Sequence, residues 1–389
     1  MKRAIVALAS AVFFLAFAVA AGQAAETIKI GSLTDTTGPY ATIGVEQHNA
    51  TEMAIEEINA AGGLLGRKLE MVREDDASNP GKSATKAEKL FLQDKVDFIV
   101  GTISSGATLN AMNIAKKYEK VMMVPISMSP KITGDNCNKY TFRVNSNSYF
   151  ESKTGAQIMK KMGGKVFFLA ADYEWGKATT QTFKDEVLAS GGTSVGEMYF
   201  PLGTKDFAPY FGKVQAAKPD VLLITASSKD AISSITQVQE FGINKRMKLF
   251  GPGSFTSGEV LAAVGAKADG IQKVDQWSPT IKTPENVAFI QAYTKRYGRE
   301  PNKFTTATYE SVMWLAQAVK KAGSVEGAKV AAAMEGSTYN GPQGPKTMRK
   351  SDHQALMDMY VLDIQGGRDE MVSKVPAAEL TIPEECSGM

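Results

Sequence analysis

The chain has 389 residues, 43% hydrophobic and 22% charged, a composition that excludes disordered and fibrous proteins. At roughly 150 residues per domain, the length predicts two domains, with three as the alternative. The 44 basic and 41 acidic residues give a formal net charge of only +3, which argues against nucleic acid or an anionic membrane surface as the partner and leaves a small molecule as the expected one.

The first 25 residues have the pattern of a cleavable secretory signal peptide. Lys2 and Arg3 precede an apolar run from Ala4 to Ala21, and the small residues at 18–24 leave the exact cleavage position open. A membrane anchor is the alternative, because the run is nearly as long as the ~20 residues that span a bilayer. The run contains no cysteine, which excludes a lipidated N-terminus. We therefore expect a mature protein free in an exported compartment, whose formal charge falls from +3 to about +1 once Lys2 and Arg3 are removed.

Short apolar runs alternate with amphipathic stretches from residue 27 onward. Apolar residues at helical spacing, such as Ala50, Ala54 and Ile58, predict helices, and the short apolar runs between them predict buried strands. Strands are expected at 28–33, 68–74, 97–100 and 122–124, and helices at 44–61, 81–93 and 105–118. Because alternating strands and helices build right-handed parallel units, this stretch predicts one doubly wound α/β lobe.

The same pattern starts again after a polar patch at 141–152. Strands are expected at 165–170, 192–200, 221–225 and 248–250, and helices at 176–190, 207–217 and 231–241. Two further helices, 285–297 and 306–321, follow with no strand between them, and a turn at 341–345 precedes a strand at 357–364. Two doubly wound lobes place the carboxyl ends of their parallel strands across a shared cleft, which predicts a hinged clamp around a ligand.

Cys137 and Cys386 are the two cysteines of the chain. In an exported protein two cysteines are more often paired than free, so we expect a disulfide between the C-terminal tail and a loop of the first lobe. Two unpaired thiols are the alternative. Half of a metal site is a weaker one, because the chain has only His48 and His353 to complete it.

Enzyme motifs are missing from the sequence. There is no Walker loop, no Gly-x-Gly-x-x-Gly after a predicted strand and no Gly-x-Ser-x-Gly elbow. His48 and His353 are expected on the solvated surface, although a catalytic triad that forms only in space is invisible to sequence reasoning. We expect a protein that is not an enzyme and uses no cofactor or metal.

Hydroxyl groups follow the strands of the first lobe. Ser104, Ser105 and Thr108 lie where the third strand passes into a helix, and a serine at a helix start is first of all an N-cap. The same helix end also attracts a carboxylate through its free N–H groups and its dipole. Ser127 and Ser129 lie in the turn between Pro125 and Pro130, at the end of the next strand. These five residues are candidates for binding a ligand.

Aromatic residues are expected to form the other wall of the cleft. Tyr173 and Trp175 follow the first strand of the second lobe and open a helix, so they are placed at the cleft, with simple packing as the alternative role. Ser227 follows the strand 221–225 and is a further candidate, and Tyr40 is a candidate wall from the first lobe.

Taken together, the chain resembles the periplasmic leucine/isoleucine/valine-binding protein family of ABC transporters. The resemblance rests on Ile-Lys-Ile-Gly-Ser-Leu-Thr-Asp-Thr-Thr-Gly-Pro-Tyr at 28–40 and Ala-Ile-Glu-Glu-Ile-Asn-Ala-Ala-Gly-Gly-Leu-Leu-Gly-Arg-Lys-Leu at 54–69, with supporting matches at Trp175-Gly176, Phe250-Gly251-Pro252 and Thr308-Tyr309.

This resemblance implies a type I periplasmic binding fold, in which two lobes joined by a hinge of three crossover strands close on a small solute and deliver it to a permease. The lobes would comprise residues 26–146 plus 279–352 and residues 147–278 plus 353–389. The family's roles would place Ser105 on the ligand carboxylate, with Trp175 and Tyr309 as aromatic contacts. A monomer in the periplasm is expected.

Two departures from the family pattern bear on the ligand. Amino-acid binders of this family carry a threonine in the turn 125–130, and a glutamate directly after the Gly-Pro of the second lobe; both help to hold the α-carboxylate and α-ammonium. Met128 and Gly253 stand at those places here. A buried ammonium without an anion is costly, so the lost glutamate predicts an aromatic or apolar carboxylic acid, or a neutral amide.

Other ligands and activities stay open at this stage. Asp172, Glu174 or Asp275 could supply the missing anion, which would restore a branched-chain amino-acid receptor. A secreted α/β hydrolase is the third reading, and it would need a nucleophile and a base.

Overall fold

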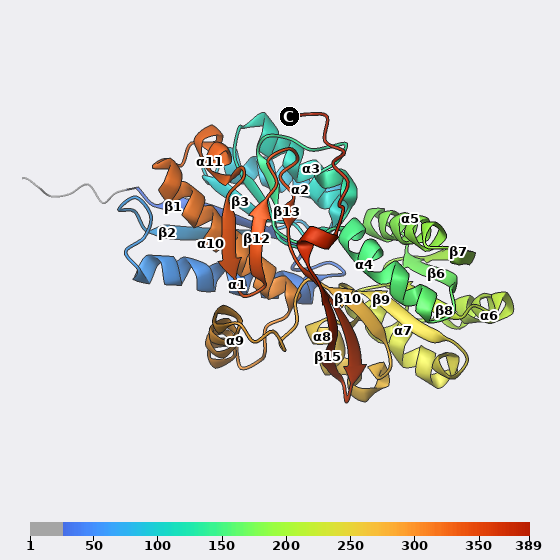
Figure 1. Ribbon diagram of the computed structural model, residues 1–389. Coiled ribbons are helices and arrows are strands. Elements are labelled where there is room, and N and C mark those ends of the chain that lie inside the picture. The colour runs from blue at the N-terminus through green and yellow to red at the C-terminus, as the bar shows by residue number, and fades with distance from the viewer. Residues whose placement is uncertain (1–25) are drawn as a thin grey trace, which may run out of the picture.

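The computed structural model describes residues 26–389, which form two α/β lobes lying side by side (Figure 1). The expected signal peptide, residues 1–25, lies outside the described residues. Within the described part of the chain, no helix is long and apolar enough to cross a membrane.

The first lobe is built on a five-stranded sheet in the order β2-β1-β3-β4-β5, in which every neighbouring pair is parallel. Helices cover both faces of this sheet: Ala54 packs on one face with Trp314, and Leu90 packs on the other with Met112. The elements are β1 (Ile28–Thr34), α1 (Ala41–Ala60), β2 (Leu69–Asp75), α2 (Pro80–Leu92), β3 (Phe98–Gly101), α3 (Ser105–Lys117), β4 (Met122–Val124) and β5 (Thr141–Arg143). This is the predicted doubly wound lobe.

The second lobe carries a seven-stranded sheet in the order β15-β14-β10-β9-β8-β6-β7. Strands β6 to β10 are parallel to one another, whereas β14 is antiparallel to β10 and forms an antiparallel hairpin with β15 at one edge. The elements are α4 (Ser148–Lys161), β6 (Lys165–Ala171), α5 (Glu174–Ala189), β7 (Thr193–Phe200), α6 (Ala208–Ala217), β8 (Val221–Thr225), α7 (Ser228–Glu240), β9 (Lys248–Pro252), α8 (Gly258–Val264), β10 (Gln272–Asp275), β14 (Met359–Gln365) and β15 (Arg368–Val375).

The chain returns to the first lobe between β10 and β14. Helix α10 packs along α1, and α11 packs on α10, so these helices complete the first lobe (Figure 1). A small antiparallel sheet follows them. The elements are α9 (Pro284–Tyr297), α10 (Lys303–Ala322), α11 (Gly327–Met334), β11 (Thr338–Gly341), β12 (Gly344–Met348) and β13 (Ala355–Leu356).

Besides the C-terminal tail, three short segments cross between the lobes, at 144–147, 276–283 and 357–358. They are the three connections expected of the hinge. The structure corrects one predicted boundary, because residues 353–389 were expected in the second lobe. Strand β13 instead pairs with β12, and the C-terminal tail runs back from β15 to the first lobe.

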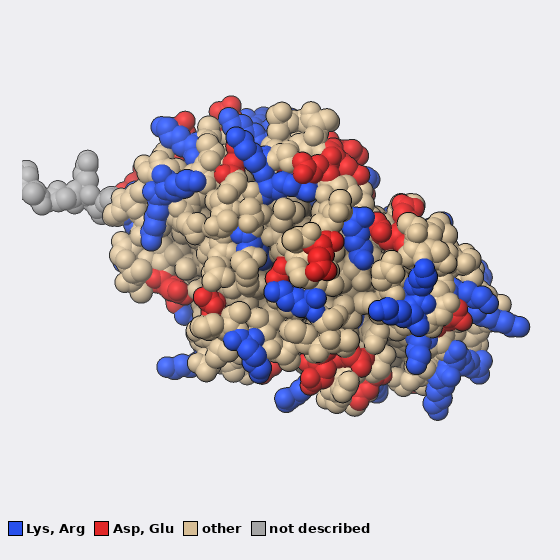
Figure 2. Space-filling model, viewed as in Figure 1, with Lys and Arg blue, Asp and Glu red and all other residues tan. Residues whose placement is uncertain are grey.

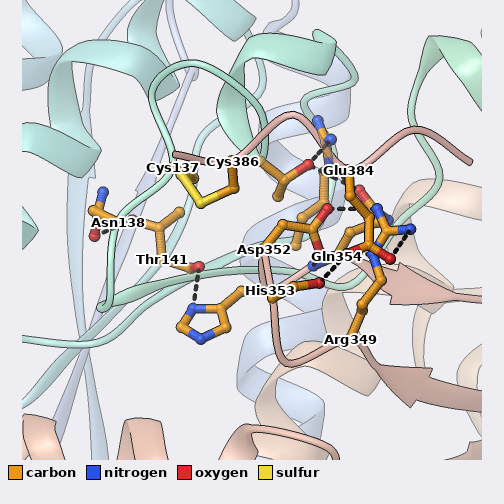
Figure 3. The surroundings of a disulfide bond; sticks show 12 residues. Cys137, Asn138, Thr141, Arg349, Asp352, His353, Gln354, Glu384 and Cys386 are labelled. Carbon is orange, nitrogen blue, oxygen red and sulfur yellow. Dashed lines mark hydrogen bonds and ion pairs between the residues drawn. A yellow bond between two sulfur atoms is a disulfide. The ribbon is translucent and has the colours of Figure 1, made fainter. Parts of the chain in front are cut away.

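The predicted disulfide between Cys137 and Cys386 is confirmed, and it fastens that tail (Figure 3). Arg349 supports the same segment, since its guanidinium donates to the carbonyl oxygens of Ile382 and Pro383, each at 2.9 Å. Because the two cysteines are bonded to each other, the alternatives of two free thiols and of half a metal site do not apply to them.

The surface carries charges of both signs. On the face seen in Figure 2, basic and acidic side chains are interspersed, with basic ones more frequent over the second lobe. This agrees with the small formal net charge of +3 and with a small-molecule partner rather than a polyanion.

Candidate functional site

A cavity lies between the lobes, with an empty volume of about 330 Å³ that includes open solvent. Its walls are aromatic or aliphatic, with two serine hydroxyls. The first lobe contributes Tyr40, Ile43, Ile103, Ser105, Ile126, Met128 and Phe304, and the second contributes Tyr173, Trp175 and Ser254. A ligand in this space touches both lobes at once.

Ser105 begins helix α3 at the wall of the cavity. The N-cap residue Ser104 makes no side-chain hydrogen bond to the first turn of α3. The N–H groups of that turn are therefore not capped by this side chain. The Ser105 hydroxyl oxygen accepts a 3.2 Å hydrogen bond from the backbone N–H of Ser129, which leaves its hydrogen free to donate. An N–H-rich helix end with a free hydroxyl donor suits a carboxylate.

The strand-to-helix turn before Ser105 depends on Gly101. This residue has a φ of +153°, and a Cβ there would lie 2.0 Å from the carbonyl oxygen of Leu33. Two hydroxyls brace the turn from behind: Ser127 Oγ donates to the carbonyl oxygens of Thr102 and Ile103, and Thr108 Oγ1 lies 2.8 Å from Thr102 Oγ1.

Several predicted ligand contacts therefore do not line the cavity. Thr108 and Ser127 brace the turn instead, and Ser104 contributes its carbonyl oxygen, which accepts from Thr102 and Thr108. Ser129 Oγ donates across the lobe boundary to Glu174 at 2.8 Å. Ser227 is the N-cap of α7 and lies outside the cavity wall.

Tyr309 is also placed elsewhere than the resemblance implied. Its ring packs in the core of the first lobe, 4.7 Å from that of Phe289 between centroids, and its hydroxyl donates to Glu57 Oε2 at 2.6 Å. Phe304, five residues earlier on α10, lines the cavity in place of Tyr309.

Tyr40, Tyr173 and Trp175, the expected aromatic residues of the cleft, line the cavity together with Phe304. The Tyr40 and Tyr173 ring centroids lie 6.1 Å apart across the lobe boundary, and those of Tyr173 and Trp175 are 6.0 Å apart. Gly176 lets α5 start close to its strand, since a Cβ there would lie 1.9 Å from the carbonyl oxygen of Ala171. Burial raises the pKa of both Tyr40 and Tyr173 well above the usual phenol value, so both hydroxyls stay neutral.

No charged side chain of the described residues lines the cavity. The three carboxylates considered as partners for a ligand ammonium are engaged elsewhere. Asp275 lies 3.1 Å from Lys303 Nζ, Asp172 lies 2.8 Å from Lys177 Nζ, and Glu174 pairs with Ser129 and Lys131.

Gly253 lies behind the wall, beside the buried Lys303 and Asp275 pair. Its backbone N–H donates to Glu151 Oε1 at 3.0 Å, and a Cβ on it would lie 2.5 Å from both Asp275 Cγ and Lys303 Nζ. The space that a longer side chain would need at this position is filled by that ion pair, while the next residue, Ser254, lines the cavity.

The two histidines take no part in the site. The expectation that His353 lies on the surface is wrong, because this residue is fully buried. Its ring stacks on that of Phe142 with the centroids 3.9 Å apart. Its Nδ1 lies 3.2 Å from the carbonyl oxygen of Thr141 (Figure 3). His48 is partly buried, with Nδ1 2.9 Å from Ser32 Oγ, and burial lowers its pKa to about 4. Neither lines the cavity, and the described residues contain no cluster of three potential metal ligands.

Sequence reasoning missed the aliphatic side of the cavity. Ile43, Ile103, Ile126 and Phe304 form one apolar cluster with Tyr40. The pattern of the sequence marks such residues as apolar but does not separate those facing the cleft from those facing the core. For Ser254 the sequence offered one signal, its position directly after Gly253 and a few residues beyond the predicted strand 248–250.

Comparisons with known proteins agree with this geometry. Residues 27–369 match the periplasmic binding protein family. The Leu/Ile/Val-binding protein homolog 4 of Brucella abortus (strain 2308) is 26% identical, covering 90% of this chain and 87% of its own length. The leucine-, isoleucine-, valine-, threonine- and alanine-binding protein of Pseudomonas aeruginosa is 27% identical, with 85% and 89% covered.

Solved structures extend the likeness. A solute-binding protein of an ABC transporter from Rhodopseudomonas palustris BisB5, in complex with 3,4-dihydroxybenzoic acid, is 27% identical with a TM-score of 0.84, covering 90% of this chain and 98% of its own. A benzoate complex from R. palustris is 26% identical with a TM-score of 0.85, with 90% and 97% covered. Because the family match spans residues 27–369 and the solved structures align over 90% of the chain, this protein belongs to the periplasmic binding protein family, as a type I solute-binding receptor of an ABC transporter.

Proposed function

We propose that this receptor binds an aromatic carboxylic acid between its lobes. The observation that carries the proposal is the cavity wall itself: four aromatic side chains, no charged one among the described residues, and Ser105 at an uncapped helix start. The benzoate and dihydroxybenzoate complexes of relatives at 26% and 27% identity support it.

The wall favours this ligand class on energetic grounds. A carboxylate that accepts hydrogen bonds from Ser105 and the first turn of α3 gains charge-assisted bonds of about 1.5–3 kcal/mol each. An aromatic ring at this wall would pack against Tyr173, Trp175 and Phe304, which removes its apolar surface from water. An α-ammonium in the same place would be desolvated with no anion in the wall, which costs several kcal/mol.

Binding and closing are one event in this scheme. The carboxylate contacts the first lobe and the ring contacts the second, so the ligand favours the closed arrangement over an open one. No covalent chemistry is needed. We infer that residues 1–25 are a signal peptide, and that the mature protein acts as a periplasmic monomer that delivers its ligand to an ABC permease in the inner membrane.

A thermal-shift and calorimetry series on residues 26–389 tests the proposal. The series compares benzoate, 4-hydroxybenzoate, cyclohexanecarboxylate, benzamide and leucine. Ligand at about 100 times its Kd adds about 2.7 kcal/mol to the folded state, which raises the melting temperature by several degrees. Aromatic acids should stabilise and leucine should not. A response to benzamide equal to that of benzoate would replace the acid with a neutral amide.

The second candidate is a branched-chain amino-acid receptor. Glu151 Oε2 favours it, because this carboxylate oxygen is buried beside Gly253 with no hydrogen-bond partner among the described residues. A relative from Streptococcus pneumoniae, 25% identical with a TM-score of 0.81, was solved in complex with isoleucine. Stabilisation by leucine that is lost in Glu151→Gln would establish this candidate and overturn the first.

A further inference from the structure

Two polar atoms on the second-lobe wall of the cavity are buried without a partner. Trp175 and Ser254 both line the cavity and are only 5% and 4% exposed. Trp175 Nε1 and Ser254 Oγ have no hydrogen-bond partner among the described residues. Other buried polar atoms of the described residues also lack a partner, but Trp175 Nε1 and Ser254 Oγ are the two that belong to residues lining the cavity, where a ligand could supply the missing partner.

The other tryptophans of the chain show the contrast. Trp277 Nε1 donates to Asn286 Oδ1 at 2.8 Å, and Trp314 Nε1 donates to Ser337 Oγ at 2.9 Å. The indole of Trp175 is thus the exception among the three, and it is the one that faces the ligand cavity. The Ser105 hydroxyl, on the opposite wall, is already oriented by the N–H of Ser129.

We propose that Trp175 Nε1 and Ser254 Oγ recognise a phenolic hydroxyl on the ligand ring, so that the receptor selects hydroxylated aromatic acids over unsubstituted ones. The inference rests on the proposed function, because the carboxylate at Ser105 directs the ring toward this wall. An indole N–H only donates, whereas a serine hydroxyl both donates and accepts. A phenolic hydroxyl can accept from the indole and donate to Ser254 Oγ, which satisfies both orphans, while the C–H of benzoate satisfies neither.

Selectivity should follow from this pairing. A site built to hydrogen-bond a hydroxyl rejects the analogue that lacks it, because the protein groups are then left unpaired. Calorimetry should show 4-hydroxybenzoate or 3-hydroxybenzoate binding at least about tenfold more tightly than benzoate. Whichever hydroxybenzoate binds more tightly identifies the ring position that reaches the two atoms.

Two variants that each remove one polar atom complete the experiment. Ser254→Ala and Trp175→Phe should each weaken the preferred hydroxybenzoate about tenfold more than they weaken benzoate, because only the hydroxybenzoate loses a hydrogen bond. Trp314→Phe, which removes an indole N–H in the core of the first lobe, is the matched control and should leave both affinities unchanged. Far-ultraviolet circular dichroism of each variant confirms the fold.

The outcomes separate this inference from the proposed function. Equal affinity of wild type for benzoate and both hydroxybenzoates overturns the inference and leaves the proposed function standing. An equal loss of benzoate and hydroxybenzoate affinity in the two variants also overturns it, since Trp175 and Ser254 would then contact the ring or the carboxylate, which both ligands share, and not the hydroxyl. No binding of any aromatic acid to wild type overturns both.

Discussion

Ser105 and Gly253 illustrate how single residues set the chemistry of this cleft. Ser105 offers a free hydroxyl hydrogen beside the uncapped start of α3. Gly253 has no side chain, and the space beside it holds the ion pair of Lys303 and Asp275. Ser105 thus supplies a hydrogen-bond donor for a ligand carboxylate. At Gly253, the ion pair of Lys303 and Asp275 fills the space that a side-chain carboxylate would need in order to bind a ligand ammonium.

Ser105→Ala should weaken the binding of an aromatic carboxylate about tenfold or more, because one hydrogen bond to a charged group is worth about 1.5–3 kcal/mol. Isothermal titration with benzoate measures the change. Ser104→Ala is the matched control, since Ser104 makes no side-chain cap and does not line the cavity. Equal losses in the two variants would show that the helix start, rather than the Ser105 hydroxyl, binds the ligand.

Gly253→Glu should destabilise the fold by about 1–3 kcal/mol and create no leucine binding. By the family pattern, a glutamate at this position would favour binding of an amino acid. The new Cβ would, however, lie 2.5 Å from Asp275 Cγ and Lys303 Nζ, and this overpacking is expected to destabilise the fold before the carboxylate can reach a ligand. Thermal unfolding with and without leucine tests this. Gly212→Ala, on a helix position with nothing within 4 Å, is the control and should not lower the melting temperature. A gain in leucine affinity would contradict the assigned geometry.

At the scale of elements, the start of α4 brings buried charge to the boundary between the lobes. Glu151 of α4 is fully buried, with Oε1 3.5 Å from the Lys303 ammonium at the start of α10, and Lys303 also pairs with Asp275 at the end of β10. Lys273 extends the network by pairing with Asp275 and with Asp369 of β15. Elements of both lobes therefore share one set of charges.

Stability should depend on pH through Glu151. Burial raises the pKa of this carboxyl to about 7, against an ordinary value of 4.5, so the folded state holds a proton that the unfolded state releases between these values. The free energy of unfolding therefore falls as pH rises from about 4.5 to 7, by roughly 3 kcal/mol from this group. Glu151→Gln, which does not titrate, should flatten that part of the profile in chemical unfolding experiments.

The control for that profile is Glu197→Gln, at an exposed glutamate 2.9 Å from Lys184 Nζ, and it should keep the wild-type slope. An unchanged slope in Glu151→Gln would assign the pH dependence to other buried carboxyls. Asp76 is one such group, because burial raises its pKa to about 6.

A comparison of several elements shows where sequence reasoning predicted the fold and where it failed. Strands β4 and β8 were predicted at their observed bounds, since their apolar runs are buried on both faces. Strand β5 and helix α4 were not predicted, and the sequence at 141–152 was described only as a polar patch, because Arg143, Ser148 and Glu151 are polar in sequence yet buried at the lobe boundary. Strand β15 escaped prediction for the opposite reason, as most of its residues are exposed at a sheet edge.

The candidate site was predictable only where chemistry marked it. Ser105, Tyr173 and Trp175 follow strand ends and were placed correctly at the cavity, whereas Tyr309 and Ser227 depend on helix orientation that one sequence does not determine. The aliphatic wall could not be predicted, because a core isoleucine and a cleft isoleucine have the same pattern.

For the whole molecule, the C-terminal tail acts as an additional link between the lobes. It leaves β15 of the second lobe and ends on the first lobe, where Cys386 bonds to Cys137 across a sequence separation of 249 residues (Figure 3). Arg349 and Tyr149 also hold it, through Ile382, Pro383 and Glu385. The tail thus has both covalent and polar attachments.

Replacing both cysteines by serine should lower the free energy of unfolding by about 2–4 kcal/mol, because the disulfide closes a long loop in the unfolded chain. Chemical unfolding of the oxidised wild type and the double variant measures this. Neither cysteine lines the cavity, so the Kd for benzoate should stay within about threefold of wild type. A large loss of affinity would mean that the tail determines how the lobes close.

The position of this bond also determines what a protease would release. All three crossings between the lobes, at 144–147, 276–283 and 357–358, lie between Cys137 and Cys386 and thus within one covalent ring. A single cut at any crossing opens the ring without dividing the molecule, so the nicked protein should run as one species in non-reducing electrophoresis and as two fragments after reduction. In an exported compartment where proteases are present, a receptor nicked once at its hinge would still keep both halves of its binding site together.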